Sequence, residues 1–158
     1  MFRELTRKNQ QLSHEECVRI LQTELRGVLS VNGQDGYPYG MPMNHWYDPA
    51  DGRLYFHCGK VGHRLDALRR SDKVSFCVMD EGRREPDSWP LHFRSVIAFG
   101  RIRVVDDPQR VVEITTKLCH KFTRDEAYIQ GEIAGFARHT LLLEMTVEHL
   151  CGKRVQES

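Results

Sequence analysis

Hydrophobic and polar positions along the chain alternate mainly with the period of two that is typical of half-buried β-strands. The alternation is clearest over residues 73–79 and 139–149. Further strands are predicted from apolar and β-branched runs between turn residues, over residues 28–32, 37–47, 53–58 and 91–105. A bulge or bend is expected at Gly100, within the last of these strands. Tight turns join most of these six segments in chain order, which indicates antiparallel neighbours.

Helical periodicity occurs only in a few separate stretches. A helix is expected over residues 14–26, with a capping box that begins at Ser13. Asp107 and Pro108 begin a second long helix, and shorter helical stretches lie elsewhere between the strands. Because helices and strands do not alternate, the pattern argues against a doubly wound parallel sheet. It predicts a mainly β protein with peripheral helices: one domain, residues 1–158, built on an antiparallel six-stranded barrel.

Composition and charge narrow the function classes. The 158 residues carry 23 Lys and Arg against 22 Asp and Glu, and this net charge of +1 gives no electrostatic footprint for nucleic acid. No apolar run approaches the ~18 residues of a membrane span, and the polar start of the chain lacks the apolar core of a signal peptide. The five cysteines include no C-x-x-C pair and are expected to be reduced thiols. These features favour a cytoplasmic protein that binds neither nucleic acid nor membrane.

The segment richest in chemistry is a basic, glycine-containing loop at residues 59–64, between a strand and a helix. Its two glycines permit close approach of a ligand to the backbone, and the start of the following helix offers free N–H groups. Lys60, His63 and Arg64 add positive charge, and an arginine can grip two oxygen atoms at once. The loop predicts a phosphate site, with a solvated basic loop as the alternative.

A metal site is a second interpretation of the same region, because His57, Cys58 and His63 are all competent ligands. However, His57 and Cys58 are adjacent on a strand, so their side chains point to opposite faces. No carboxylate or thiol lies at partner spacing. No metal site is expected here.

Several short motifs occur in an order that is similar to one protein family. They are Gly36-Tyr37-Pro38, Pro42, Asp51-Gly52, Leu54-Tyr55-Phe56-His57, Gly62-His63-Arg64, Leu68, Val74-Ser75-Phe76, Arg94-Ser95-Val96 and Phe99-Gly100-Arg101. In this order and spacing the chain resembles the pyridoxamine 5'-phosphate oxidase-like flavin-binding split barrels, in the branch related to nitroimidazole-resistance (Nim) proteins. The resemblance covers nearly the whole chain and implies an antiparallel six-stranded split β-barrel.

The resemblance also implies a homodimer with FMN sites at the subunit interface. It places Gly62, His63 and Arg64 at the FMN phosphate, with Lys60 nearby. The other cofactor-binding residues that it implies are Met41, Pro42, Met43 and Asn44 along the edge of the flavin ring, His57 and Cys58 beside the ribityl chain or ring, and Ser95 and Val96 on the long strand. His57 is the candidate proton donor, since an imidazole with an ordinary pKa near ~6.5 exchanges protons at neutral pH. A structural hydrogen bond is the alternative role for His57.

The function that the resemblance implies is FMN-dependent oxidation or reduction of a small molecule, such as a nitro-aromatic or quinone-like acceptor. The alternative is a split barrel that holds FMN, haem or the deazaflavin F420 without turnover. Oxidation of vitamin B6 is not expected. Residues 153–158 lack the Trp- and Arg-bearing segment with which true pyridoxamine phosphate oxidases hold their substrate.

Overall fold

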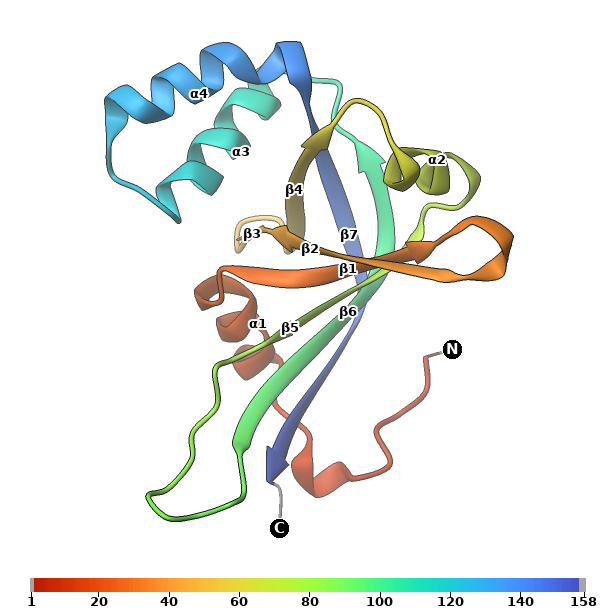
Figure 1. Cartoon of the computed structure of the whole chain (residues 1–158), viewed down its shortest axis with the longest axis vertical. Coiled ribbons are helices and arrows are strands. Elements are labelled where there is room, and N and C mark those ends of the chain that lie inside the picture. The colour runs from red at the N-terminus through yellow and green to blue at the C-terminus, as the bar shows by residue number, and fades with distance from the viewer. Residues whose placement is uncertain (1, 157–158) are drawn as a thin grey trace.

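The computed structural model describes residues 2–156, apart from the side chains of residues 136–138 and 156. Its strands form one antiparallel sheet that curls into a partly closed barrel (Figure 1). The strands are β1 (Arg26–Asn32), β2 (Pro38–Asn44), β3 (Trp46–Asp48), β4 (Arg53–Gly59), β5 (Lys73–Met79), β6 (His92–Val104) and β7 (Thr140–Gln156). Their order across the sheet is β2-β1-β5-β6-β7-β4-β3. The prediction of a mainly β, antiparallel split barrel is therefore confirmed.

The described sheet has seven strands rather than six, because the segment expected as one strand over residues 37–47 is two. β2 and β3 lie at opposite ends of the sheet order, yet only His45 separates them in the chain. The chain leaves its pairing with β1 at this residue and turns to pair with β4, so the two ends of the curled sheet are drawn together. The buried His45 imidazole donates its Nε2–H to the carbonyl oxygen of Leu21, 2.7 Å away, which fixes the corner.

Helix α1 (His14–Thr23) begins with the expected capping box at Ser13 but ends three residues before residue 26. Gly27, which could have stopped a longer helix, lies within β1 instead. A Cβ atom at Gly27 would collide with the carbonyl oxygen of Cys77, so this glycine allows β1 and β5 to approach closely. The apolar face of α1 completes the barrel core with Cys17, Ile20 and Leu21.

Two long strands run the length of the molecule, and β6 pairs with β7 over thirteen positions (Figure 1). The register shifts between Phe99 and Gly100, which confirms the bulge expected at Gly100. A Cβ atom at Gly100 would collide with the carbonyl of Thr146 across the strands. Glycine is therefore required where the two strands bend together.

The remaining helices lie outside the barrel (Figure 1). They are α2 (His63–Arg70), α3 (Pro108–His120) and α4 (Glu126–His139), and 3-10 turns occur at Lys8–Gln10 and Gln34–Gly36. α3 begins with Asp107 as its cap and Pro108 in its first turn, as expected. Its Arg110 guanidinium donates to Asp51 and to the buried Tyr55 hydroxyl, at 2.6 and 2.8 Å, and anchors the helical hairpin to β4.

Candidate functional site

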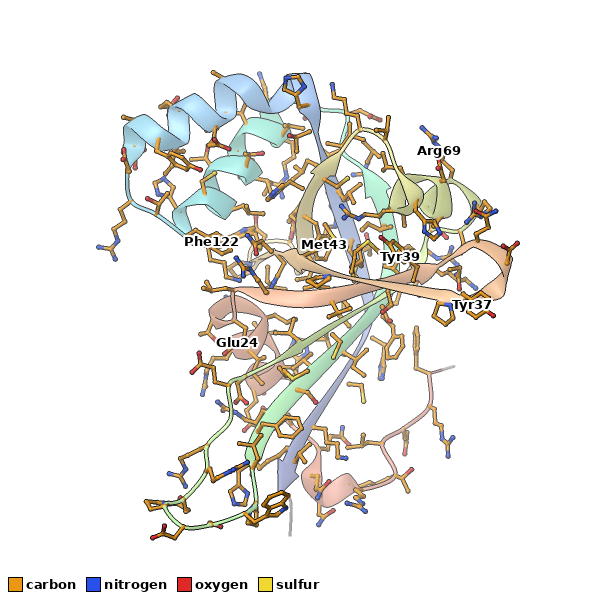
Figure 2. All side chains as sticks on the ribbon, viewed as in Figure 1. Glu24, Tyr37, Tyr39, Met43, Arg69 and Phe122 are labelled. Carbon is orange, nitrogen blue, oxygen red and sulfur yellow. The ribbon has the colours of Figure 1, made fainter. Side chains whose placement is uncertain are left out.

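The loop between β4 and α2 encloses a small cavity at one end of the barrel. Its volume is about 180 Å³. The residues that line it are Tyr39, Cys58, Gly59, Val61, Gly62, His63, Arg64 and Leu65. The edge strand β2, through Tyr39 (labelled in Figure 2), the end of β4 and the first turn of α2 therefore all contribute a wall.

The amino terminus of α2 faces this cavity without a side-chain cap. Its N-cap residue is Gly62, with φ 123° and ψ 172°, and no side chain accepts a hydrogen bond from the first turn. By contrast, Ser13, Asp107 and Asp125 each accept a backbone N–H at the start of the other three helices. The first-turn N–H groups of α2 and the positive end of its dipole are thus available to an anion.

Arg64 projects from this first turn and makes no ion pair with any residue that the structure describes. Four arginines of the described chain are half-buried, and the other three, Arg53, Arg94 and Arg110, all pair with carboxylates. The Arg64 Nε lies 2.8 Å from the Met41 sulfur instead. A half-buried guanidinium held by a thioether retains its capacity to bind an anion.

The thiol of Cys58 lies on the inner side of β4, next to Arg64. Burial raises the pKa of Cys58, and a hydrogen bond with the Arg64 guanidinium offsets part of that rise. The thiol is therefore protonated at neutral pH. It serves as a neutral wall of the cavity, with no thiolate to compete for Arg64.

His63 has a fixed ring plane at the mouth of the cavity. Its imidazole stacks on Tyr39, with 4.3 Å between ring centroids. The backbone N–H of Gln34 donates to Nε2 over 3.4 Å, so the neutral ring carries its proton on Nδ1. Nε2 is thus engaged by the backbone, and Nδ1 is the ring nitrogen left for a ligand of the cavity that His63 lines.

His57 lies on the opposite face of β4 from Cys58, as the strand alternation predicts, and its side chain reaches the surface. Partial desolvation lowers the pKa of His57, the positive charge of Arg64 lowers it further, and Glu132 on α4 opposes these effects. The imidazole is consequently more neutral at pH 7 than a free histidine. Binding of an anion at Arg64 would restore part of its affinity for a proton.

The structure brings some of the predicted site residues together and separates others. Cys58, Gly62, His63 and Arg64 line one cavity, and Met41 contacts Arg64. Lys60 is exposed in the same loop. Along β2 the remaining predicted residues alternate: Met43 is buried in the core, and Pro42 and Asn44 face outward.

Ser95 and Val96 do not reach this cavity. Phe56 on β4, near the cavity, and Val104 at the last position of β6 both pair with Leu143 on β7, so they lie at the same level of the sheet. Ser95 lies nine residues earlier, or about 30 Å along the strand at ~3.3 Å per residue. Val96 is fully buried in the barrel core.

Two features of the site have little sequence signal. Tyr39 was not among the predicted residues, although its position two residues before Met41 on an edge strand places both on one face. The contact between Arg64 and Met41 joins residues 23 positions apart, and no local pattern encodes it.

No helix in the described part of the chain is long and apolar enough to cross a membrane.

The fold is a split barrel with a cavity lined by His63 and Arg64 at one end, and known proteins share this fold. The family model described as pyridoxamine 5'-phosphate oxidase matches residues 13–154, and the chain belongs to this family. A search of the curated proteins finds no match.

Several solved structures share the fold. A candidate 5-nitroimidazole antibiotic resistance protein from Bacteroides thetaiotaomicron aligns with a TM-score of 0.77 and 18% identity, covering 92% of this chain and 87% of that chain. A conserved hypothetical protein from Mycobacterium tuberculosis aligns with a TM-score of 0.77 and 19% identity, over 96% and 89%. An FAD-binding protein from Mesorhizobium loti aligns with a TM-score of 0.68 and 20% identity, over 92% and 97%. The chain thus has the fold of these structures and belongs to the pyridoxamine 5'-phosphate oxidase family.

Proposed function

We propose that this protein is an FMN-dependent oxidoreductase that acts on a small molecule. The observation that carries the proposal is Arg64, a half-buried arginine with no acid partner among the described residues, at the uncapped start of α2. A phosphate monoester matches this set of donors, because a helix terminus and a guanidinium both favour a compact dianion. Family membership supports a flavin as the molecule that carries the phosphate.

Several residues around the cavity would together bind FMN. Arg64, the Nδ1–H of His63 and the first-turn N–H groups of α2 would bind the phosphate, and Gly62 leaves the backbone accessible. A bound flavin would supply hydride or single-electron transfer. His57, across β4 from Cys58, would hold or release a proton near the cofactor. The charge of a bound phosphate would raise its pKa towards the range that suits this exchange.

The outer face of the sheet supports a homodimer. Cross-strand partners share a face, and the pairings align Pro42, Val28, Cys77, Ile97 and Cys151 in one row over five strands. The row is apolar, and Val28, its residue on β1, is 39% exposed. A second copy packed on this face would bury the row and bring its own flavin near Ser95, which lies on the same face. Light scattering should give twice the monomer mass, and Val28→Glu should give the monomer.

The proposed substrates are nitro-aromatic or quinone-like acceptors. The fold shared with the candidate nitroimidazole-resistance protein and the family membership support this class. We further propose a cytoplasmic location, because all five cysteines are free thiols, as in reducing compartments.

The decisive measurement is the absorption spectrum of the purified protein, with reconstitution by FMN and by riboflavin. A flavin band near ~450 nm is expected, whereas a Soret band near ~400 nm would favour the haem-binding alternative. FMN should bind on the order of 100-fold more tightly than riboflavin, because riboflavin lacks the phosphate. Anaerobic NADH or NADPH should bleach the band, and a nitro-aromatic or quinone should restore it. A colourless protein that takes up no FMN would contradict the proposal, and a flavoprotein that neither donor bleaches would be a carrier.

A further inference from the structure

A cavity of about 660 Å³ lies between the end of α1, the loop that follows β5 and the first residues of β6. Its volume is within the roughly 300–1,000 Å³ that is typical of small-molecule sites. Arg94 lines this cavity and precedes Val104 by ten residues on β6, or about 33 Å at ~3.3 Å per residue. The cavity therefore lies at the end of the barrel opposite Arg64, where the loop after β5 extends away from α2 (Figure 1).

Two arginines form one wall of this cavity. Arg94 on β6 and Arg154 on β7 are direct cross-strand partners, so their Cβ atoms lie about 5 Å apart on one face of the sheet. Like charges in this arrangement cost stability, and one carboxylate balances each of them. Asp80 accepts from Arg94 at 2.8 Å, and Glu16 accepts from Arg154 at 3.0 Å. Because a guanidinium has five N–H groups, both arginines keep donors for a further carboxylate.

A second wall of the cavity is negatively charged. Glu24, the C-cap of α1 (labelled in Figure 2), and Glu81 in the loop make no ion pair with any residue that the structure describes. Partial burial raises the pKa of Glu24, and the carboxylates of Asp80 and Glu81 raise it further. Lys121 and Arg94 lower this pKa only in part. An ammonium group bound here would relieve the excess of negative charge.

The two charged walls are close together, and apolar surface lies beside them. Arg94 is near enough to Glu24 to lower its pKa, so a short ligand can reach both charges. This spacing matches an α-amino acid, in which the ammonium and the carboxylate are attached to one carbon atom. Leu25, which is 49% exposed, and Phe93 also line the cavity and offer contacts for an apolar side chain.

We propose that this cavity binds an α-amino acid with an apolar side chain. The ligand carboxylate accepts hydrogen bonds from Arg94 and Arg154. Its ammonium donates to Glu24, and its side chain packs on Phe93. The lining residues include three acids and three arginines, so a ligand without net charge leaves the site balanced. This site is separate from the proposed flavin site and does not depend on it.

The test measures binding of L-phenylalanine to the purified protein by isothermal titration calorimetry, and one molecule should bind per chain. Phenethylamine lacks the carboxylate and 3-phenylpropanoate lacks the ammonium. Each should bind about 10-fold more weakly or worse, because one charged wall is left without its partner. Equal affinity for 3-phenylpropanoate would make this an anion site and overturn the proposal. Absence of saturable binding at about 10 mM L-phenylalanine would overturn it as well.

Two variants locate the ligand in this cavity. Glu24→Gln and Arg154→Gln should each weaken L-phenylalanine binding about 10-fold through loss of a charge-assisted hydrogen bond. The matched controls are Glu15→Gln, at an exposed position of α1, and Arg124→Gln, in the exposed linker between α3 and α4, and both should bind like the wild type.

Circular dichroism should show the same fold in all four variants. FMN titration should give one affinity for all of them, since none of these residues lines the cavity beside Arg64. Wild-type affinity for L-phenylalanine in both cavity variants would place the amino acid elsewhere and overturn the assignment, whatever the outcome of the flavin titration.

Discussion

The amino termini of α2 and α3 differ in whether a side chain accepts hydrogen bonds from their first N–H groups. Each helix follows a strand and leaves its first N–H groups without intrahelical partners. At α3, the carboxylate of Asp107 accepts the N–H groups of Gln109 and Arg110 at 2.9 and 3.4 Å, and Pro108 has no N–H to satisfy. At α2, the N-cap is Gly62 and no side chain accepts.

The start of α3 is capped by its own side chain, whereas the first N–H groups of α2 have no side-chain acceptor. A capping carboxylate at α2 would occupy the place of a phosphate and repel it. No carboxylate lines the cavity at this terminus, where the Cys58 thiol is neutral and Arg64 has no acid partner among the described residues. The one acid of the first turn, Asp66, pairs with Arg69 instead. The local stability that a cap gives α3 is absent at α2, where a bound anion would supply it.

Loss of Arg64 should have the largest effect on this contrast. Arg64→Ala should weaken flavin binding by about 3 kcal/mol, or on the order of 100-fold, because the charge-assisted hydrogen bonds to phosphate disappear. Arg64→Lys should retain part of the affinity as a point charge. Fluorescence titration with FMN measures both. Riboflavin binding should be unaffected by either substitution, and an equal loss for riboflavin would place Arg64 away from the phosphate.

Gly62→Ala should have the next largest effect. A φ of 123° with extended ψ is a region that only glycine adopts readily, so alanine should cost about 2 kcal/mol of folding free energy although its Cβ meets open space. Denaturant unfolding monitored by circular dichroism measures the change. Gly59→Ala also meets open space without a positive φ, and it should be nearly neutral. Equal stability of the Gly62→Ala variant and the wild type would show that alanine adopts this conformation without cost.

Asp107→Ala should destabilise the protein by about 1 kcal/mol through loss of the α3 cap. The same denaturant experiment measures this change. Flavin affinity should stay the same, because α3 contributes no residue to the cavity. A large loss of FMN binding in this variant would show that the two helix termini are coupled.

The smallest effect should be a change in the protonation of His57. The positive charge of Arg64 disfavours the imidazolium, so removing that charge in Arg64→Ala should raise the pKa of His57 towards its ordinary value. Desolvation remains and should keep this pKa below the free value. NMR titration of the histidine signals follows the change, and addition of FMN to the wild type should shift the pKa in the same direction. A pKa that falls in either case would contradict the proximity of the two groups.

Local rules account for the parts of the molecule that the sequence predicts well. The capping box at Ser13 and the Asp107–Pro108 start of α3 each depend on residues close together in the chain. The basic loop at residues 59–64 is equally local, since its glycines and cations are contiguous. These features can be predicted from the local sequence because no contact between distant segments is needed to form them.

The parts that the sequence does not predict depend on contacts between distant segments. The division of residues 37–47 at His45 arises because β2 and β3 pair with different strands, and the buried imidazole is held by α1. The stacking of Tyr39 on His63 and the contact of Met41 with Arg64 require the edge strand to lie beside α2. No sequence pattern within β2 or α2 predicts that the two elements lie side by side.

β7 follows every other strand in the chain and yet lies inside the sheet, between β6 and β4. Its pairing with β4 joins Phe56 to Leu143, residues separated by most of the barrel sequence. Before β7 docks, β6 and β4 both present unpaired backbone edges, which are sites for aggregation. Contacts of such long sequence separation fold slowly. The barrel and its cavity should therefore form in one late cooperative step. A folding intermediate in which β7 has not yet paired is the species that chaperones would most need to protect from aggregation.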